Sequence, residues 1–248
     1  MKAMVLAAGQ GTRLRPITER LPKALVPVAG RPMIDYALLL LRHYEIREVI
    51  INLHHFGGLI EAYLGDGGRL GLKITYSNEP ELLDTGGGLL KAKPFLDGDT
   101  FIVINTDVLI YLNLAELIAF HKNKNACATL VLRADENADH YGSMDVDPTG
   151  RLCRFLNTKA PHAPSGPIEK LMFTGVQILE PAVFAFMNND GKPRKFGTTT
   201  QTYPRMVAAG EALYGFRFDG FWQDLGTPER IKFVEEKLAS GRAALHYA

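Results

Sequence analysis

The chain has 248 residues, and 46% of them are hydrophobic, so it is long enough for one large α/β domain or two small ones and apolar enough to fill a core. Lys and Arg number 28 against 27 Asp and Glu, a formal net charge of +1, so no basic excess indicates nucleic acid as a partner. No apolar stretch of about 18 residues is present, and the first residues enter a strand pattern directly, so we expect neither a membrane-spanning helix nor a secretory signal.

The first half of the chain alternates strand-like and helix-like patterns. Residues 3–8 form a short, nearly all-apolar run, as expected for a strand covered on both faces. The pattern then predicts, in chain order, a helix opened by Pro32, a strand over 48–52, a short helix over 59–64, a strand over 73–77, a helix over 88–96, a strand over 101–105 and a helix capped by Asn113. This rhythm predicts a Rossmann-like α/β fold, with a mostly parallel central sheet and helices on both faces.

The second half is predicted to form a smaller, β-rich lobe. Strands are expected over 128–133, 143–146, 151–156, 174–179 and 214–218, a short helix from Pro181, and a terminal amphipathic helix over 228–238. The turn sequence Asp-Pro-Thr-Gly at 147–150 joins the second of these strands to the third. Residues 160–169 and 188–200 are rich in Pro, Gly or Thr, so we expect long loops there, and loops of this length are often functional.

A glycine-rich loop follows the first predicted strand and ends in an arginine. Gly9 and Gly11 let backbone N–H groups turn toward an anion without interference from a Cβ atom. Arg13, and Lys23 ten residues later, add fixed positive charge. This combination suits the binding of a nucleoside triphosphate.

Two other nucleotide-binding motifs do not match these residues. A dinucleotide fold requires a third glycine where Leu14 stands, and an acid at the end of the second strand, where the chain has Asn52 and Leu53. A P-loop requires Gly-Lys-Ser/Thr at the start of a helix, and residues 11–13 read Gly-Thr-Arg. For the loop taken alone, an ordinary strand-to-helix turn stays open.

Six segments in order along the chain extend this pattern. They are Gly9-x-Gly11-Thr12-Arg13-Leu14-x-Pro16 with Pro22-Lys23-x-Leu25-Val26-Pro27-Val28, Asp84-Thr85-Gly86-Gly87-Gly88, Asn105-Thr106-Asp107, Phe155 to Pro161, Phe173-Thr174-Gly175-Val176, and Trp222-Gln223-Asp224-Leu225-Gly226-Thr227-Pro228. Together they resemble the signature of the sugar-1-phosphate nucleotidylyltransferases, the nucleotide-sugar pyrophosphorylases. The resemblance is to short forms such as mannose-1-phosphate guanylyltransferases and N-acetylmuramate-1-phosphate uridylyltransferases.

The resemblance implies a nucleotide-diphospho-sugar transferase fold and one nucleotidyltransferase domain over 1–248. Its nucleotide-binding half would cover about 1–125 and its sugar-binding half about 126–227, followed by a C-terminal helix over 228–240. The implied reaction moves a nucleotidyl group from a nucleoside triphosphate to a sugar 1-phosphate and releases pyrophosphate.

The implied catalytic residues are Arg13, Lys23 and Asp107. Arg13 would hold the departing pyrophosphate, and Lys23 would bridge the phosphates near the α-phosphorus. Asp107 follows the strand at 101–105, at the edge where open α/β sheets place ligands, and with Asp224 it would bind Mg²⁺, which prefers oxygen ligands. The pairing of Asp107 with Asp224 rests on the resemblance alone.

The implied binding residues fall into two groups. Nucleotide contacts are expected from Leu6, Ala7, Ala8, Gly9, Gly11, Thr12, Arg13, Lys23, Glu79, Thr85, Gly86 and Asn105. Sugar-phosphate contacts are expected from Lys159, Thr174, Gly175 and Asp224. The chain departs from the family here, because Thr158 stands where many members carry Glu and Ala160 separates Lys159 from Pro161.

The base and the sugar are less constrained than the reaction. A Glu79 carboxylate only accepts hydrogen bonds, so it suits guanine, which offers N1–H and an amino group side by side. This favours GTP slightly and leaves UTP open. The alternatives are a UTP-dependent N-acetylmuramate-1-phosphate uridylyltransferase, a cytidylyltransferase acting on a non-sugar phosphate such as phosphocholine, and a module that binds a nucleotide sugar without turnover.

The two cysteines indicate the compartment. Cys127 and Cys153 lie in apolar, strand-like surroundings, so we expect reduced core thiols and a cytoplasmic protein. The sequence leaves the oligomeric state open, and a homodimer is one state compatible with it.

Overall fold

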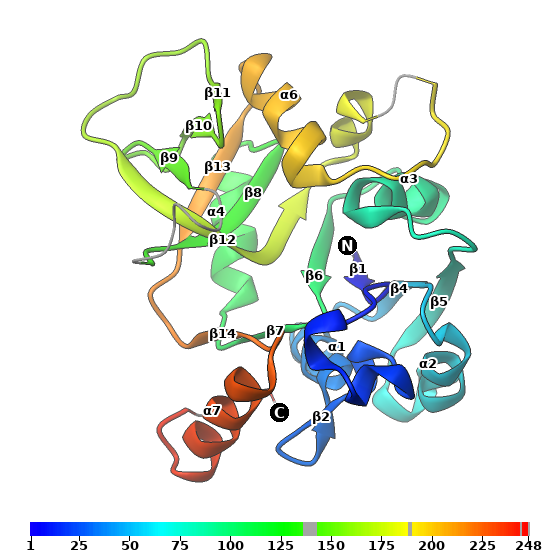
Figure 1. Cartoon of the computed structure of the whole chain (residues 1–248). Helices are drawn as coiled ribbons and strands as arrows, with labels where there is room; N and C mark the ends of the chain where they lie inside the picture. The colour runs from blue at the N-terminus through cyan, green and yellow to red at the C-terminus, as the bar shows by residue number, and fades with distance from the viewer. Residues whose placement is uncertain (136–142, 188–189, 244, 248) are drawn as a thin grey trace. The chain divides into compact units, whose positions relative to one another are not determined.

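The computed structural model describes residues 1–135, 143–187, 190–243 and 245–247 (Figure 1). The chain forms two compact units and passes between them several times. Unit 1 comprises Met1–Leu82, Ile104–Leu112 and Gly220–Ala248, and unit 2 comprises Leu83–Val103 and Asn113–Asp219. Both combine strands with helices, which confirms the predicted α/β class. The expected nucleotide-binding and sugar-binding halves concern function, and they stay a prediction.

A parallel sheet forms the centre of unit 1. Its strands are β1 (Lys2–Leu6), β4 (Glu48–Leu53), β5 (Lys73–Asn78) and the end of β6 (Phe101–Asn105), in the order β6-β1-β4-β5. Ala3 lies opposite Val49 in the β1–β4 pair, and Glu48 lies opposite Lys73 in the β4–β5 pair. Because the strands are parallel, the residues that follow them lie along one edge of the sheet.

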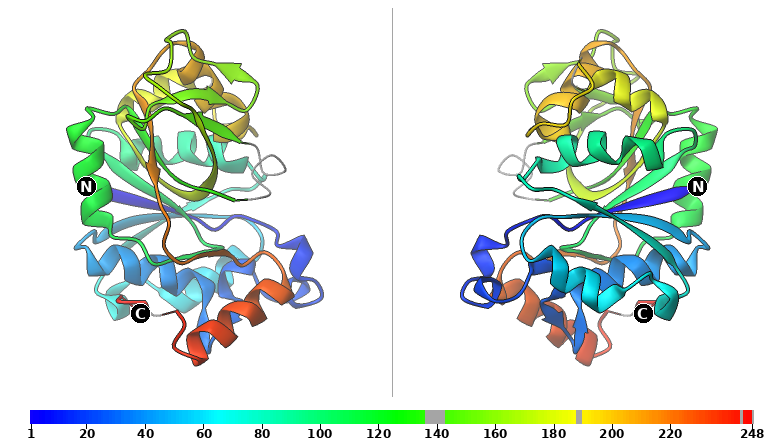
Figure 2. Two further views of the ribbon diagram at one scale, coloured as in Figure 1. Left: turned by 90° about the vertical axis from the view of Figure 1, so that its left-hand side faces the viewer. Right: turned by 90° about the vertical axis from the view of Figure 1, so that its right-hand side faces the viewer.

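The helices of unit 1 begin close to the residues that the sequence indicates. They are α1 (Met33–His43), α2 (Gly57–Leu64) and α7 (Pro228–Ala239), and Figure 2 shows α1 and α2 against the same face of the sheet. Pro32 precedes α1, as predicted, and the residues of that helix from Met33 to Leu41 are buried. Gly65 ends α2 with a positive φ of 57°, a conformation that favours glycine.

The connections of unit 1 contain short elements. The loop after β1 folds into three 3-10 helices, η1 (Thr12–Leu14), η2 (Ile17–Glu19) and η3 (Lys23–Leu25), and a fourth, η4 (Gly68–Leu70), precedes β5. Two small antiparallel sheets pair β2 (Pro27–Val28) with β3 (Arg31–Pro32), and β7 (Val108–Ile110) with β14 (Trp222–Asp224). The sequence pattern did not predict these strands, because two or three residues are too few to establish a period.

Unit 2 is built around one long strand, β12 (Glu169–Leu179). It pairs antiparallel with β8 (Ala128–Arg133) and β9 (Met144–Val146), and the neighbouring strands are β10 (Leu152–Phe155), β11 (Thr158–Lys159) and β13 (Leu213–Arg217). β13 runs parallel to β8. The prediction of a strand over 174–179 started too late, because Glu169 and Lys170 at the start of β12 are exposed and polar and give no apolar signal.

The helices of unit 2 include two that the sequence pattern did not predict. They are α3 (Asp84–Leu96), α4 (Leu114–Asn123), the 3-10 helix η5 (Pro181–Phe186), the π-helix η6 (Thr198–Thr202) and α6 (Tyr203–Ala208). The predicted cap of α4 is confirmed, since Asn113 Oδ1 accepts the N–H groups of Ala115 and Glu116. α3 begins four residues before the predicted Gly88, because three glycines in a row suppress the helix signal. η6 and α6 were not predicted.

Both cysteines are free and buried, as expected. Burial raises the pKa of the Cys127 thiol to about 11, and it also raises the pKa of Cys153. Both groups are therefore protonated thiols at neutral pH. Among the described residues, no helix is long and apolar enough to cross a membrane.

The predicted turn between β9 and β10 is built around the buried carboxylate of Asp147. Its Oδ1 accepts bonds from the Thr149 N–H, the Thr149 hydroxyl and the Arg151 N–H. Its Oδ2 accepts bonds from the N–H and the hydroxyl of Ser165. Burial alone would raise the pKa of Asp147, but these hydrogen bonds outweigh burial and lower it below its ordinary value.

We expect Asp147→Asn to destabilise the protein by about 1–3 kcal/mol at pH 7, because an amide cannot accept all five bonds. A lowered folded-state pKa contributes stability above the ordinary value of 3.8, and this stability is lost as the pH falls through the folded-state pKa. The difference in the free energy of unfolding between wild type and Asp147→Asn should therefore narrow as the pH falls below 3.8. Urea unfolding of Asp147→Asn, wild type and the exposed control Asp219→Asn at a series of pH values measures this, and a difference independent of pH would contradict it.

Candidate active site

The segments that carry Arg13, Lys23, Asp107 and Asp224 converge within unit 1 because each contributes to one hydrophobic cluster. The buried members of this cluster are Leu14, Val26, Val28, Met33, Tyr36, Leu109, Leu225, Ile231 and Val234. Leu14 and Leu225 each directly follow a predicted site residue in the chain. Burial of these side chains therefore fixes the segments that carry the charged groups.

Lys23 and Asp107 form an ion pair between the Nζ atom and Oδ2. Lys23 is only 9% exposed, and a lysine is rarely buried to this degree without a partner. Its backbone lies in η3, just before the buried Val26. The amino group is thus held at the end of β6, beside the carboxylate that follows the strand.

Asp224 is brought next to the Asp107 segment by the pairing of β14 with β7. Asp224 lies opposite Val108, and the N–H of Leu225 donates to the carbonyl oxygen of Asp107 at 2.8 Å. Two segments from distant parts of the chain are therefore neighbours. Joint binding of a metal ion by Asp107 and Asp224, which the resemblance implied, stays a prediction.

Arg13 lies against the segment that follows Asp224. A Cβ atom on Gly226 would collide with Nη2 of Arg13, and it would lie 2.7 Å from Oδ1 of Asp224. The guanidinium and the carboxylate therefore both approach this glycine. With both side chains as they lie, a Cβ atom at this position would require one of them to shift.

Arg230 is a charged residue of this site that sequence reasoning missed. Its Nη1 atom donates to Oδ1 of Asp224 at 2.5 Å. Arg230 lies in the first turn of α7, where its own N–H bonds to the capping hydroxyl of Thr227. The available signal was local: a helix cap shortly after Asp224 turns the first helical residues back toward that carboxylate.

Gly11 must be glycine for two reasons. Its φ is +64°, and a Cβ atom there would lie 2.9 Å from Cβ of Lys23 and from Cγ2 of Thr18. The Thr18 hydroxyl donates to the Gly11 carbonyl at 2.8 Å. The left-handed backbone and this close approach place the loop directly on the Lys23 segment. Gly9 and Thr12, by contrast, are exposed.

The carboxyl ends of β1, β4 and β5 are joined by side chains. The N–H of Ala7 donates to Oδ1 of Asn52 at 2.9 Å, and Nδ2 of Asn52 donates to Oε1 of Glu79 at 2.8 Å. Thr106 donates its N–H and its hydroxyl to the carbonyl oxygen of Leu6. Leu6, Ala7 and Glu79 were expected at a nucleotide site, whereas Asn52 and Thr106 were not singled out for it. Asn105, the last residue of β6, is half-buried.

Ala8 is buried two residues after the end of β1 in unit 1, and the remaining predicted residues belong to unit 2. Thr85 accepts a bond from the N–H of Thr198 at 2.9 Å, and the N–H of Gly86 donates to the carbonyl oxygen of Phe196 at 2.9 Å. Thr174 is 1% exposed and donates its hydroxyl to the carbonyl oxygen of Val131. The other two are the exposed Lys159 on β11 and Gly175 in β12. Contacts of these residues with substrates stay predictions.

Two glycines of α3 are required by packing. The N–H groups of Gly86 and Gly87 both donate to the carbonyl oxygen of Phe196. A Cβ atom on Gly86 would collide with the ring of Phe196, and one on Gly87 would collide with the carbonyl oxygen of Arg194. Residues 194–196 therefore lie directly on the first turn of the helix.

We expect Gly87→Ala to lower the free energy of unfolding by about 1–3 kcal/mol, because the backbone of Arg194 must move to admit the methyl group. For a chain of this size this is a melting temperature lower by about 2–12 °C. The matched control is Gly58→Ala in α2, where a Cβ atom meets nothing within 4 Å. Thermal unfolding of both variants tests the expectation, and equal stability would contradict it.

The two proposed metal ligands fit a divalent cation in their chemistry. Each carboxylate already faces positive charge, Asp107 from Lys23 and Asp224 from Arg230. Mg²⁺ is usually held by one or two carboxylates together with substrate phosphates, and this pair matches that set. Among the residues that the structure describes, no group of three or more His, Cys, Asp and Glu side chains could hold a metal ion.

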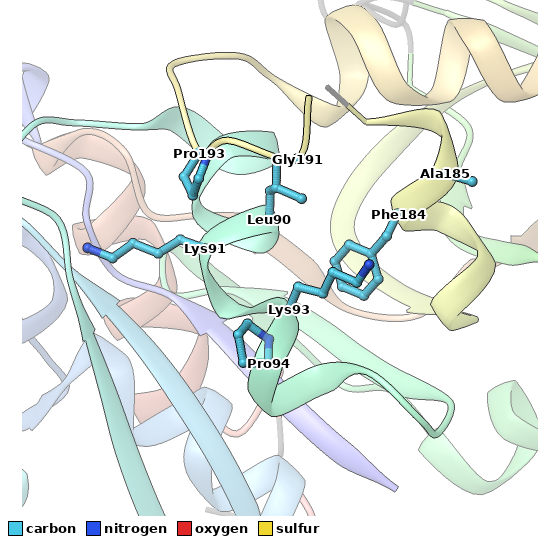
Figure 3. Close-up of a pocket in the computed structure, with 8 residues that line it drawn as sticks. All are labelled: Leu90, Lys91, Lys93, Pro94, Phe184, Ala185, Gly191 and Pro193. Carbon is cyan, nitrogen blue, oxygen red and sulfur yellow. The ribbon is translucent and has the colours of Figure 1, made fainter. Parts of the chain in front are cut away.

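Unit 2 contains a cavity of about 510 Å³ (Figure 3). Its lining residues are Leu90, Lys91, Lys93, Pro94, Phe184, Ala185, Gly191 and Pro193. The Lys93 ammonium lies 5.5 Å from the centre of the Phe184 ring, and the Lys91 side chain extends away from Phe184 in Figure 3. No predicted site residue lines this cavity, so it is distinct from the candidate active site.

Comparison with known proteins identifies relatives over almost the whole chain. The family described as Nucleotidyl transferase matches residues 2–241. A UTP–glucose-1-phosphate uridylyltransferase of Synechocystis is 34% identical over 240 residues, which cover 91% of this chain and 60% of that protein. A mannose-1-phosphate guanylyltransferase of Mycobacterium tuberculosis is 34% identical over 242 residues, which cover 97% of this chain and 65% of that protein. The chain thus spans less than two thirds of the length of these two relatives.

A third relative matches from end to end. The N-acetylmuramate alpha-1-phosphate uridylyltransferase of Neisseria meningitidis is 35% identical over 237 residues, which cover 94% of this chain and 96% of that protein. Among solved structures, a putative glucose-1-phosphate thymidylyltransferase of Bacillus anthracis has a TM-score of 0.77 at 21% identity and covers 95% of this chain and 94% of its own. HddC of Yersinia pseudotuberculosis has a TM-score of 0.75 at 24% identity and covers 96% of this chain and 99% of its own. These structures confirm the nucleotide-diphospho-sugar transferase fold, and the chain belongs to the nucleotidyl transferase family, as its motifs predicted.

Proposed function

We propose that this protein transfers a nucleotidyl group from a nucleoside triphosphate to a sugar 1-phosphate and releases pyrophosphate. The observation that supports this most directly is the convergence of Arg13, Lys23, Asp107 and Asp224 in unit 1. Two cations and two carboxylates beside a glycine loop suit a pair of phosphorylated reactants. The printed names of the relatives, all sugar-1-phosphate nucleotidyltransferases, support the same reaction class.

The chemical problem is charge. An oxygen of the sugar phosphate attacks the α-phosphorus and forms a new P–O bond, and the bond from that phosphorus to the bridging oxygen breaks, so pyrophosphate leaves with the electron pair. Both reactants are anions, so they must be neutralised and aligned before this step. Arg13 would hold two oxygens of the leaving group with its planar fork, and Lys23 would bridge the phosphates at the α-position. Backbone N–H groups of Gly9, Gly11 and Thr12 would bind the remaining oxygens.

Asp107 and Asp224 are the residues that would hold Mg²⁺. When bound, the ion supplies positive charge that neutralises the phosphate oxygens. In the chain itself, Lys23 and Arg230 are the cations beside these carboxylates. Arg230 would orient Asp224 from the first turn of α7, and Lys23 would exchange the Asp107 carboxylate for a phosphate oxygen when the nucleotide binds.

Recognition of the base would involve Glu79. This side chain is 3% exposed and follows β5 at the carboxyl edge of the sheet. A carboxylate suits guanine better than uracil, which favours GTP slightly and leaves UTP open. The remaining proposed contacts to the nucleotide are Leu6, Ala7, Ala8, Thr85, Gly86 and Asn105, and those to the sugar phosphate are Lys159, Thr174 and Gly175.

The test is a pyrophosphate-release assay with each nucleoside triphosphate against glucose, mannose and N-acetylmuramate 1-phosphates, with phosphocholine added to the panel. We expect release with GTP or UTP and at least one sugar phosphate, and we expect a chelator of Mg²⁺ to abolish it. Nucleotide binding without release for any pair would favour a binding module. Release only with CTP and phosphocholine would favour the cytidylyltransferase alternative.

We also infer a cytoplasmic location, because the buried, reduced thiols of Cys127 and Cys153 suit a reducing compartment. That the protein forms a homodimer also stays a prediction. Light scattering of the purified protein measures the oligomeric state directly, and a monomer at all concentrations would contradict the homodimer.

A further inference from the structure

We propose that Asn52 is a positioning residue for nucleotide recognition, whose one carboxamide couples the start of the glycine loop to the Glu79 carboxylate. The proposal rests on the proposed function, in which the loop binds the nucleotide and Glu79 contacts its base. Asn52 was noticed in the sequence only because it stands where a dinucleotide fold carries an acid. The structure gives it a specific place between two parts of the site.

The coupling follows from the order of the strands. β4 lies between β1 and β5, and all three run in parallel, so their carboxyl ends lie side by side. Asn52, near the end of β4, is 3% exposed. Its Oδ1 atom accepts the Ala7 N–H at 2.9 Å, and its Nδ2 atom donates to Oε1 of Glu79 at 2.8 Å. One side chain thus reaches both neighbouring strand ends.

Asparagine is suited to this position because the two neighbours have opposite requirements. Ala7 offers a buried N–H that needs an acceptor, and Glu79 offers a buried carboxylate oxygen that needs a donor. A carboxamide supplies one of each from a side chain of this length. Aspartate also carries an acceptor for Ala7, but it would place a second carboxylate against Glu79 and be repelled by it, and leucine would satisfy neither neighbour.

The backbone of Glu79 is fixed independently of Asn52. Its N–H donates to the carbonyl oxygen of Leu53 at 2.7 Å, and its carbonyl oxygen accepts a bond from Nδ1 of His54 at 2.9 Å. A change at Asn52 therefore alters the direction of the carboxylate while leaving the main chain of Glu79 in place. This separates the positioning role of Asn52 from general support of the fold.

Three variants divide the two halves of the coupling. Asn52→Asp places a carboxylate against that of Glu79. The repulsion between the two like charges should push the side chain at 52 away from its position at the Ala7 N–H, so both halves are disturbed. Glu79→Gln keeps an acceptor for Asn52 and changes only the group that faces the base. The double variant Asn52→Asp/Glu79→Gln restores the bond, because the amide at 79 donates to the carboxylate at 52, but it does not restore a carboxylate at 79.

The readouts are amide hydrogen exchange at Ala7 for the loop, the KM for the nucleotide, and the ratio of kcat/KM for GTP and UTP. We expect Asn52→Asp to raise the nucleotide KM about tenfold, to shift the GTP/UTP ratio and to speed exchange at Ala7. Glu79→Gln should shift the ratio and leave exchange at Ala7 unchanged. In the double variant, exchange at Ala7 should be slow again and the nucleotide KM should fall most of the way back to the wild-type value. The ratio of kcat/KM for GTP and UTP should stay shifted.

The matched control is Asn78→Asp. Asn78 precedes Glu79 in the chain, and its amide donates to the carboxylate of Glu61 at 3.1 Å in an exposed hydrogen bond. This substitution creates the same carboxylate pair at the surface and should leave all three readouts near those of wild type. A GTP/UTP ratio unmoved by Asn52→Asp, with only a lower melting temperature, would overturn the proposal. So would a double variant with no recovery at Ala7.

The wild-type assay separates this proposal from the proposed function. If wild type releases no pyrophosphate with any pair of substrates, the proposed function fails. Hydrogen exchange at Ala7 and the affinity for a fluorescent nucleotide then still test the coupling. Faster exchange and weaker binding in Asn52→Asp, with both restored in the double variant, would support it. Unchanged exchange and affinity would overturn it.

Discussion

Arg13→Ala should lower turnover by about 100- to 1,000-fold, because loss of one group that stabilises transition-state charge typically raises the barrier by about 3–4 kcal/mol. The side chain of Arg13 is exposed, and the adjacent Leu14 provides the packing of this segment, so the melting temperature should stay within about 1–2 °C of wild type. Pyrophosphate-release kinetics and thermal unfolding measure the two effects. Arg13→Lys should recover only part of the rate, since an ammonium lacks the two-pronged geometry.

The matched control for Arg13→Ala is Arg20→Ala, another exposed arginine of the same connection, which should turn over at close to the wild-type rate. Gly226→Ala provides a second approach without removal of any charge. Its methyl group would collide with the Arg13 guanidinium, so turnover should fall. If Gly226 acts through Arg13, turnover of the double variant Arg13→Ala/Gly226→Ala should be only slightly lower than that of Arg13→Ala. Additive losses in the free energy of activation would instead show independent roles. Near-normal turnover of Arg13→Ala itself would remove its assigned role.

The strands and helices were predictable wherever local chemistry and tertiary structure agree. β6 and β8 match the predicted ranges 101–105 and 128–133, since each contains a run of apolar residues, 101–104 in β6 and 130–132 in β8, that is followed by a polar residue. α4 begins at its predicted cap, Asn113, because the capping oxygen is a local device. These elements need no knowledge of distant residues.

The elements that were missed depend on distant partners. β7 and β14 are three residues each and exist because they pair with one another, although residues 111–221 separate them in the chain. The first turn of α3 contains glycines that disfavour a helix locally but are required by the packing of residues 194–196. No period in the sequence reports either condition.

The candidate site divides in the same way. The motif residues Arg13, Lys23 and Asp107 were visible as residue types in a known order, and the structure adds their association with Asp224. Asn52 and Arg230 were not recognised, because Asn52 acts through hydrogen bonds and Arg230 through an ion pair to residues that the fold holds in place. For Asn52, the register of β4 against β1 and β5 decides what its amide reaches, and that register is not a property of any short segment.

If Asp107 is a ligand of Mg²⁺, Asp107→Asn should lower turnover by about 100-fold or more. It should also raise the Mg²⁺ concentration required for half-maximal rate. The substitution keeps the size of the side chain and one acceptor, but it removes the charge that a divalent cation requires. It leaves the backbone oxygen that accepts the Leu225 N–H, so β7 and β14 should stay paired and the fold should persist. Titration of the rate with Mg²⁺, together with thermal unfolding, measures these effects.

Loss of the ion pair with Lys23 must be separated from loss of the metal. Asp97→Asn is the matched control, since Asp97 is an aspartate paired with a lysine, Lys93, at 3.9 Å on the surface, and it should leave the Mg²⁺ titration unchanged. Asp224→Asn should shift the titration in the same direction as Asp107→Asn, because both carboxylates would share the ion. If the titration of Asp107→Asn matched that of wild type, Asp107 would be a partner of Lys23 alone, and the carboxylates would then serve to orient the two cations, Lys23 and Arg230, toward the phosphates.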